Sequence, residues 1–102
     1  MTIDQSDDAL RQQLNLETGK ISWLELQRHF ARGVVVKVAP ELDLVTVAMK
    51  FVKDDKPAIE AWLNSGVIGR CSDQDAKTWS ASQPLFWAVV TAPWVLVQEL
   101  RQ

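Results

Sequence analysis

The last third of the chain constrains the fold most, because both faces of its strand pattern are apolar. From Leu85 to Gln98 the sequence is rich in β-branched and aromatic residues, which predicts strand. Pro93 interrupts this run, so we expect two strands or one bent strand at the edge of a sheet. Between Phe86 and Val90, alternate residues on both sides are apolar, and such a strand needs cover on both faces. Helices of the same chain or a partner subunit must supply that cover.

The clearest helix signal lies between Ser22 and Gly33. Ser22 and Glu25 form an S-x-x-E capping box, in which each side chain binds a backbone N–H that the helix leaves free. Gly33 follows the last turn, where a left-handed cap favours glycine. The apolar residues of this helix share one face, which we expect to be buried. A strand from Val34 to Val38 should follow it.

The remaining segments predict four helices and one strand. The segment from Leu44 to Lys53 fits both periods, and we interpret it as a helix because one narrow arc then holds all its polar residues. The other expected elements are a helix from Ser6 to about Leu16, a helix opened by Asp54 and Asp55, a strand from Val67 to Cys71 and a short helix capped by Ser72. Residues 1–5 should form a flexible tail and residues 6–102 a single globular domain. The fold class is α+β, with a three- or four-stranded sheet covered by about five helices.

Composition and charge exclude several classes of function. The 102 residues are 47% hydrophobic and 24% charged, and 11 basic against 13 acidic side chains give a formal net charge of -2. This charge gives no reason to expect a nucleic-acid partner, and a helix–turn–helix over residues 56–80 would present two Asp and one Lys to the phosphates. The longest uncharged stretch, residues 78–98, contains two prolines, so we expect no membrane span. The acidic N-terminus lacks a signal region, which predicts a cytoplasmic protein.

The chain has one cysteine, Cys71, and one histidine, His29, which limits its chemistry. One cysteine forms no internal disulfide, and these two residues fall short of the ligands of a typical metal site, so we expect no metal and no cofactor. A Cys71–His29 dyad is an alternative to a structural cysteine in a strand. We interpret Asp54 and Asp55 as helix caps rather than Mg²⁺ ligands. No catalytic motif is recognisable in the sequence. This favours a non-enzymatic protein and leaves the question of an enzyme open.

Two groups of residues are candidate functional sites. Arg28, His29 and Arg32 share one helix face, where the arginines would bind an anion and His29 would carry a proton; the alternative is a solvated face. The second group would form an interface with a second copy or another protein, and consists of Trp87, Trp94 and Leu96. The other tryptophans, Trp23, Trp62 and Trp79, lie on the inward faces of predicted helices and should pack in the core.

Several short motifs along the chain together resemble a known family. They are Trp23–Leu26, Phe30–Val35, Leu42–Val45, Asp54–Asp55 before a helix with Trp62, Phe86–Val90 and Ala92–Gln98. Because of these motifs, residues 15–98 of the chain, roughly, resemble the short bacterial proteins of domain of unknown function 2288. The resemblance implies a bacterial, cytoplasmic and self-contained domain, and it assigns no activity, cofactor or site residue.

Two functions therefore remain open. The first is a non-enzymatic interaction module that associates with itself, as a homo-oligomer, or with a protein partner through the C-terminal strand region. The alternative is a small-ligand-binding protein or enzyme, with a pocket lined by some of the five tryptophans near Arg28, His29 and Arg32.

Overall fold

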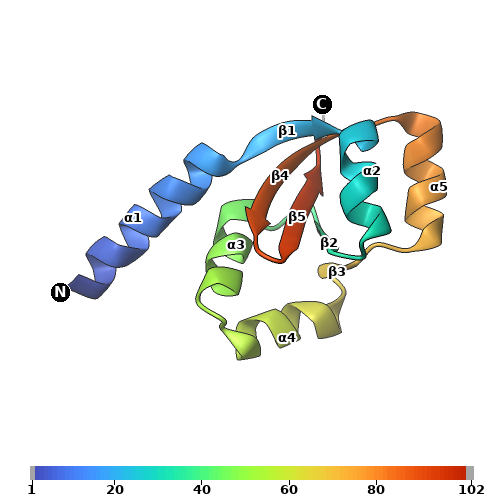
Figure 1. Ribbon diagram of the computed structural model, residues 1–102. Coiled ribbons are helices and arrows are strands. Elements are labelled where there is room, and N and C mark those ends of the chain that lie inside the picture. Colours follow the sequence, from blue (N-terminus) through green and yellow to red (C-terminus); the bar gives the residue numbers. More distant parts are fainter. Residues whose placement is uncertain (1, 101–102) are drawn as a thin grey trace.

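A computed structural model describes residues 2–100, with side chains from residue 7, and shows a five-stranded sheet with helices on both faces (Figure 1). The strands are β1 (Gly19–Ser22), β2 (Val35–Val38), β3 (Ile68–Arg70), β4 (Leu85–Thr91) and β5 (Trp94–Glu99). They lie in the order β1-β4-β5-β2-β3, where β2 and β5 pair in parallel and the other neighbours are antiparallel. The predicted α+β class is confirmed, whereas the predicted three or four strands are too few.

Five helices cover the sheet among the described residues, as predicted. They are α1 (Thr2–Glu17), α2 (Trp23–Ala31), α3 (Leu44–Val52), α4 (Lys56–Ser65) and α5 (Asp73–Ser82). Helices α2 and α5 pack on one face, and α1, α3 and α4 pack on the other. The helical interpretation of residues 44–53 is confirmed by α3. Helix α1 begins at Thr2, before the expected start at Ser6, and includes the backbone of residues 2–5. Met1 lies outside the described residues.

Local signals set the helix ends where the sequence places them. At the start of α2, the Glu25 N–H donates to Ser22 Oγ over 3.2 Å, and the Ser22 N–H donates to Glu25 Oε1 over 3.1 Å. This confirms the predicted capping box, and Ser72 opens α5 in the same way. Gly33 has a φ of +74°, the left-handed conformation that its position after α2 predicts.

Strand β1 is the element that the sequence pattern did not predict. It has four residues, which are too few to show an alternation of apolar and polar side chains. Its pairing with β4, from Gly19 opposite Ala88 to Ser22 opposite Leu85, supplies the backbone hydrogen bonds that hold it. The strand therefore forms because β4 offers a free edge, which only the tertiary structure reveals.

Of the two alternatives for residues 85–98, two strands are confirmed by β4 and β5. The other, one bent strand at an edge, is wrong, because β5 lies inside the sheet between β4 and β2. Pro93 falls in the turn of the β4–β5 hairpin, outside the ladder that ends with Thr91 opposite Trp94. Because the turn needs no ladder bond from Pro93, its missing N–H does not exclude β5 from the interior. Leu96, in the middle of β5, has 0% of its surface exposed.

The core consists of two clusters, one on each face of the sheet. The face under α2 and α5 holds a cluster of four aromatic rings whose neighbouring centroids lie 4.9–5.5 Å apart. These rings belong to Trp23, Phe30, Trp79 and Phe86. The face under α1, α3 and α4 is mainly aliphatic, with Trp62 packed half-buried at its margin. The inward placement of Trp23 and Trp79 is confirmed, and that of Trp62 is confirmed in part.

Candidate functional site

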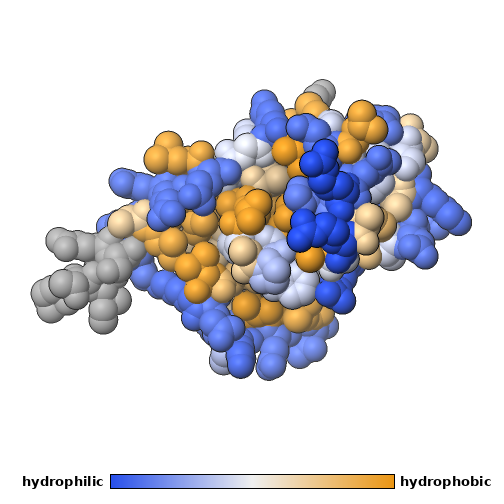
Figure 2. Space-filling view, viewed as in Figure 1, coloured by the Kyte–Doolittle hydropathy of each residue, from blue (hydrophilic) through white to orange (hydrophobic). Residues whose placement is uncertain are grey.

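A groove with a volume of about 600 Å³ lies on the α4 side of the sheet. It is bounded by α4, the end of α3, strands β2 and β3 and the turn between β4 and β5. Its apolar walls include Val36, Phe51, Ile59, Leu63, Pro93 and Trp94, and the polar residues that reach it are Asp54, Lys56, Glu60, Arg70 and Thr91. Figure 2 shows apolar side chains at the surface over α3 and α4, beside strongly hydrophilic side chains over α2.

Helix α4 forms one wall because four residues at helical spacing share its inner face. Lys56, Ile59, Glu60 and Leu63 follow the i, i+3, i+4, i+7 pattern, and all four line the groove. No residue of α4 is fully buried, and Leu63 is 48% exposed. The helix thus covers this end of the sheet only in part, which leaves the groove open.

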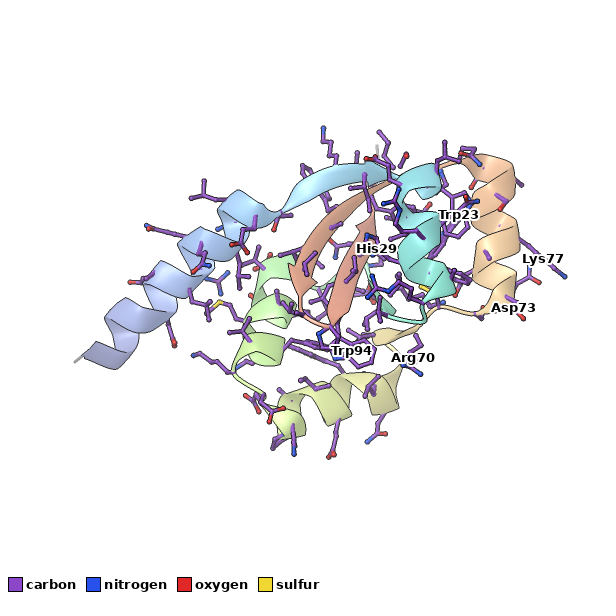
Figure 3. The ribbon with its side chains drawn as sticks, viewed as in Figure 1. Trp23, His29, Arg70, Asp73, Lys77 and Trp94 are labelled. Carbon is purple, nitrogen blue, oxygen red and sulfur yellow. The ribbon has the colours of Figure 1, made fainter. Side chains whose placement is uncertain are left out.

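Arg70 and Trp94 lie together at the sheet side of the groove. Arg70 is opposite Val36 in the β2–β3 ladder, and Trp94 begins β5 on the other side of β2. The guanidinium carbon of Arg70 lies 5.2 Å from the centroid of the Trp94 ring, which is within cation–π range. Figure 3 shows the two side chains next to each other. Since neighbouring strands are about 4.8 Å apart, the Arg70 side chain crosses the width of β2 to reach the ring.

Thr91 brings a buried hydroxyl group to the groove wall. It is the last residue of β4 and lies opposite Trp94 in the hairpin. Only 8% of Thr91 is exposed, and its Oγ1 has no hydrogen-bond partner among the described residues. A buried polar group without a partner costs about 1–3 kcal/mol. A polar atom of a ligand or a bound water at this wall would remove that cost.

The predicted group on α2 lies away from this groove. Arg28 and Arg32 are exposed and His29 is half-buried, and none of the three lines the groove. Figure 3 shows His29 on α2, apart from Arg70 and Trp94. The proposed anion site on α2 stays a prediction, because none of its three residues lines any of the four cavities of about 130–600 Å³ found among residues 7–100.

Of the three residues predicted for an interface, two reach the surface. Trp87 is 37% exposed, and the Lys20 ammonium lies 5.2 Å from the centroid of its ring. Trp94 is half-buried at the groove. Leu96 is a core residue of β5, so its side chain cannot contact a partner of the folded protein. This corrects its placement at an interface, which depended on β5 being an edge strand.

The Cys71 thiol lies in an environment that favours its neutral form. Burial raises the pKa of Cys71 to about 12, and the neighbouring Asp75 carboxylate acts in the same direction. Such a thiol is a poor nucleophile at neutral pH, which supports a structural cysteine over a dyad with His29. Burial also tends to raise the pKa of Asp75, but hydrogen bonds from Lys37, over 2.8 Å, and from Ser72 outweigh it and hold this pKa below its ordinary value.

Several acidic residues of the described structure act in caps or ion pairs. Asp55 accepts a hydrogen bond from the Ala58 N–H and lies 3.4 Å from Lys50 Nζ, which confirms it as a helix cap. The same prediction for Asp54 is wrong, because Asp54 lies in the turn before the cap, with a φ of +56°. Within residues 2–100, no three His, Cys, Asp or Glu side chains come together as a metal site would require. In the same part of the chain, no helix has the length and apolar character to cross a membrane.

Sequence patterns did not predict Arg70 and Thr91 as residues of a binding site, although the position of each in the sequence is a weak signal. Thr91 is the one hydroxyl-bearing residue in the apolar run from Leu85 to Val97. Arg70 lies inside the predicted strand of residues 67–71, where a charged side chain needs an explanation. Neither signal reveals that β2 and the hairpin bring the two residues to one groove, since that depends on the strand order.

Comparison with known proteins places the chain in a family of small domains. The chain belongs to the family described as protein of unknown function (DUF2288), whose model matches residues 9–99. It is also similar to a solved structure, the NMR solution structure of PA1075 from Pseudomonas aeruginosa, at 42% sequence identity and a TM-score of 0.80. This similarity covers 92% of the chain and 87% of the Pseudomonas protein. No protein of curated function matches.

Proposed function

We propose that this domain binds a small organic molecule in the groove between α4 and the sheet. The observation that carries the proposal is the unpartnered Thr91 hydroxyl at the wall of a groove of about 600 Å³. Ligand sites typically have volumes of about 300–1,000 Å³ and apolar walls with a few polar groups. The groove combines these features with Arg70, whose charge is available to orient a ligand.

The composition of the groove supports binding more directly than catalysis. Its polar side chains are two carboxylates, two cations and one hydroxyl, and the half-buried Cys71 lies outside it. The only histidine of the chain, His29, is on α2 and does not reach the groove. A nucleophile with an adjacent base, as acyl-transfer chemistry requires, is therefore not part of the described groove.

A titration of the ¹⁵N-labelled protein with a library of small soluble compounds tests the proposal. We expect hits to shift the backbone signal of Thr91, the indole N–H signal of Trp94 and the signals of α4, and to leave Trp23 unchanged. Thr91→Ser keeps the hydroxyl and should retain binding, whereas Thr91→Val should weaken it for ligands with a polar group at that wall. A library in which no compound shifts the groove signals, or whose hits shift only other regions, would contradict the proposal.

Self-association is a second candidate, supported by apolar side chains that β4 leaves at the surface. Leu85 is 44% and Trp87 37% exposed on one face of β4, and Val90 is 59% exposed on the opposite face. Sedimentation velocity at high micromolar concentration should then show a dimer, and Trp87→Asp should shift it to a monomer. A wild-type monomer at that concentration would rule out self-association through β4.

A further inference from the structure

The position of Arg70 narrows the chemistry of the ligand. Four cations of the described structure, Arg11, Lys37, Lys50 and Lys53, contact a carboxylate of this chain, and Arg70 is among those that do not. Arg70 is exposed and has no carboxylate within 4.0 Å among the described residues, although Asp54 and Glu60 line the same groove. Neither carboxylate of the groove thus pairs with Arg70, and the guanidinium keeps its donors free.

The Trp94 ring holds this guanidinium at the groove. The side chain of Arg70 extends over β2 and ends 5.2 Å from the ring centroid, which limits the positions that a long flexible side chain would otherwise sample. A guanidinium held in this way presents a planar fork of N–H donors, which matches the two oxygens of a carboxylate. Arg70 is therefore oriented for an anion before any ligand arrives.

The rest of the groove fits an extended apolar group more than a second charge. Ile59 on α4 and Pro93 and Trp94 at the hairpin provide apolar surface to the groove, and that of Trp94 is a flat aromatic ring. The Thr91 hydroxyl lies on β4, opposite Trp94 and across β5 and β2 from the Arg70 backbone, so it can donate to a polar atom of the ligand other than the group that Arg70 binds.

We infer that the ligand is a flat organic anion, with a carboxylate bound by Arg70 and a conjugated ring system packed beside Trp94. This inference rests on the proposed function of the groove. It differs from the predicted anion site on α2, because it assigns no role to Arg28, His29 or Arg32.

Three naphthalene derivatives test the inference by isothermal titration calorimetry and by NMR shifts of the groove. We expect 2-naphthoate to bind at least about 10-fold more tightly than the neutral 2-naphthamide, because charge-assisted hydrogen bonds are the stronger ones. Decahydro-2-naphthoate, which keeps the carboxylate but lacks the flat ring, should bind more weakly than 2-naphthoate. Equal affinity for the acid and the amide, or no binding of 2-naphthoate, would overturn the inference.

Matched variants locate the carboxylate. Arg70→Gln should weaken 2-naphthoate by about 10-fold and leave 2-naphthamide nearly unchanged, whereas Arg70→Lys should restore part of the loss. Lys77→Gln removes the same charge from an exposed position on α5, outside the groove (Figure 3), and should change affinity by less than about twofold. Equal losses in Arg70→Gln and Lys77→Gln would overturn the inference, since a general charge effect would then explain the binding.

The two proposals fail in different ways. If 2-naphthoate does not bind but other library compounds shift the Thr91 and Trp94 signals, the ligand class is wrong and the binding function stands. If no compound of either set shifts these signals, the binding function fails, and the ligand class fails with it.

Discussion

The two faces of the sheet are built from similar elements but are covered to different degrees. Under α2 and α5, Trp23, Phe30, Trp79 and Phe86 form a chain of ring contacts, and Leu26 and Phe86 have 0% of their surface exposed. Under α4, by contrast, the helix contributes no fully buried side chain, and the groove separates it from the sheet. Both faces therefore have helices over them and a cavity at the margin, of about 600 Å³ at α4 and about 320 Å³ at α5, but the fully buried aromatic rings of the described residues all lie under α2 and α5.

The difference shows how a small domain can keep a stable core and an open site together. Large aromatic side chains pack against one another under α2 and α5. The other face achieves similar packing under α3, where Val47 is 1% and Ala48 0% exposed. The groove opens only where α4 and the hairpin turn meet, so the site lies at the margin of the core rather than inside it.

Two Leu→Ala variants compare the packing of α2 on one face of the sheet with that of α4 on the other. Leu26→Ala should lower the free energy of unfolding by about 2–5 kcal/mol, because it leaves a cavity under α2. Leu63→Ala, at a position that is 48% exposed on α4, should cost about 0.5 kcal/mol. Urea denaturation measures both values. Similar losses in the two variants would show that α4 packs as tightly as α2 does.

A substitution at the groove wall should stabilise the protein. Thr91→Val replaces the unpartnered hydroxyl by a methyl group of similar size and should raise the free energy of unfolding by about 1 kcal/mol. For a domain of this size, such a gain corresponds to an increase in Tm of about 4–8 °C. Thr91→Ser keeps the hydroxyl and serves as the control. A lower Tm for Thr91→Val would mean that the hydroxyl has a partner in solution.

The ion pair between Lys37 on β2 and Asp75 on α5 should make the free energy of unfolding depend on pH. The pKa of Asp75 lies below its ordinary value in the folded protein, so its contribution is present above the unfolded pKa of about 3.9 and is lost as the pH falls through the folded pKa. We expect Asp75→Asn to lower stability by no more than about 1 kcal/mol at pH 7 and to have less effect at pH 2–3. Thermal melts across this pH range measure the difference, and a difference independent of pH would contradict the assignment to the ionised carboxylate.

The smallest effect should come from His29. Its side chain is half-buried on α2, and no hydrogen bond of it is seen in the described structure. His29→Ala should change the free energy of unfolding by no more than about 0.5 kcal/mol and should leave binding in the groove intact. A loss of ligand binding in this variant would indicate that the ligand binds at the predicted site on α2 rather than in the groove.

The sequence predicted elements well where the signal is local. The Ser22–Glu25 capping box, the left-handed Gly33 and the α3 helix are each encoded within about ten residues, and all appear in the structure. Strand β1 and the interior position of β5 were missed, since both depend on β4 as a pairing partner. The groove was missed for the same reason, because Arg70 and Trp94 meet only across β2.

The interior position of β5 has a consequence for how the chain is synthesised. The β4–β5 hairpin, residues 85–99, joins β1 on one side to the β2–β3 pair on the other. A nascent chain is made from its N-terminus, so β1, β2 and β3 emerge before the hairpin that connects them exists. Until then each of these strands has an unpaired edge, which invites pairing with other chains. Strands β4 and β5 are thus synthesised last, and the five-stranded sheet can form only after residue 99 has been translated.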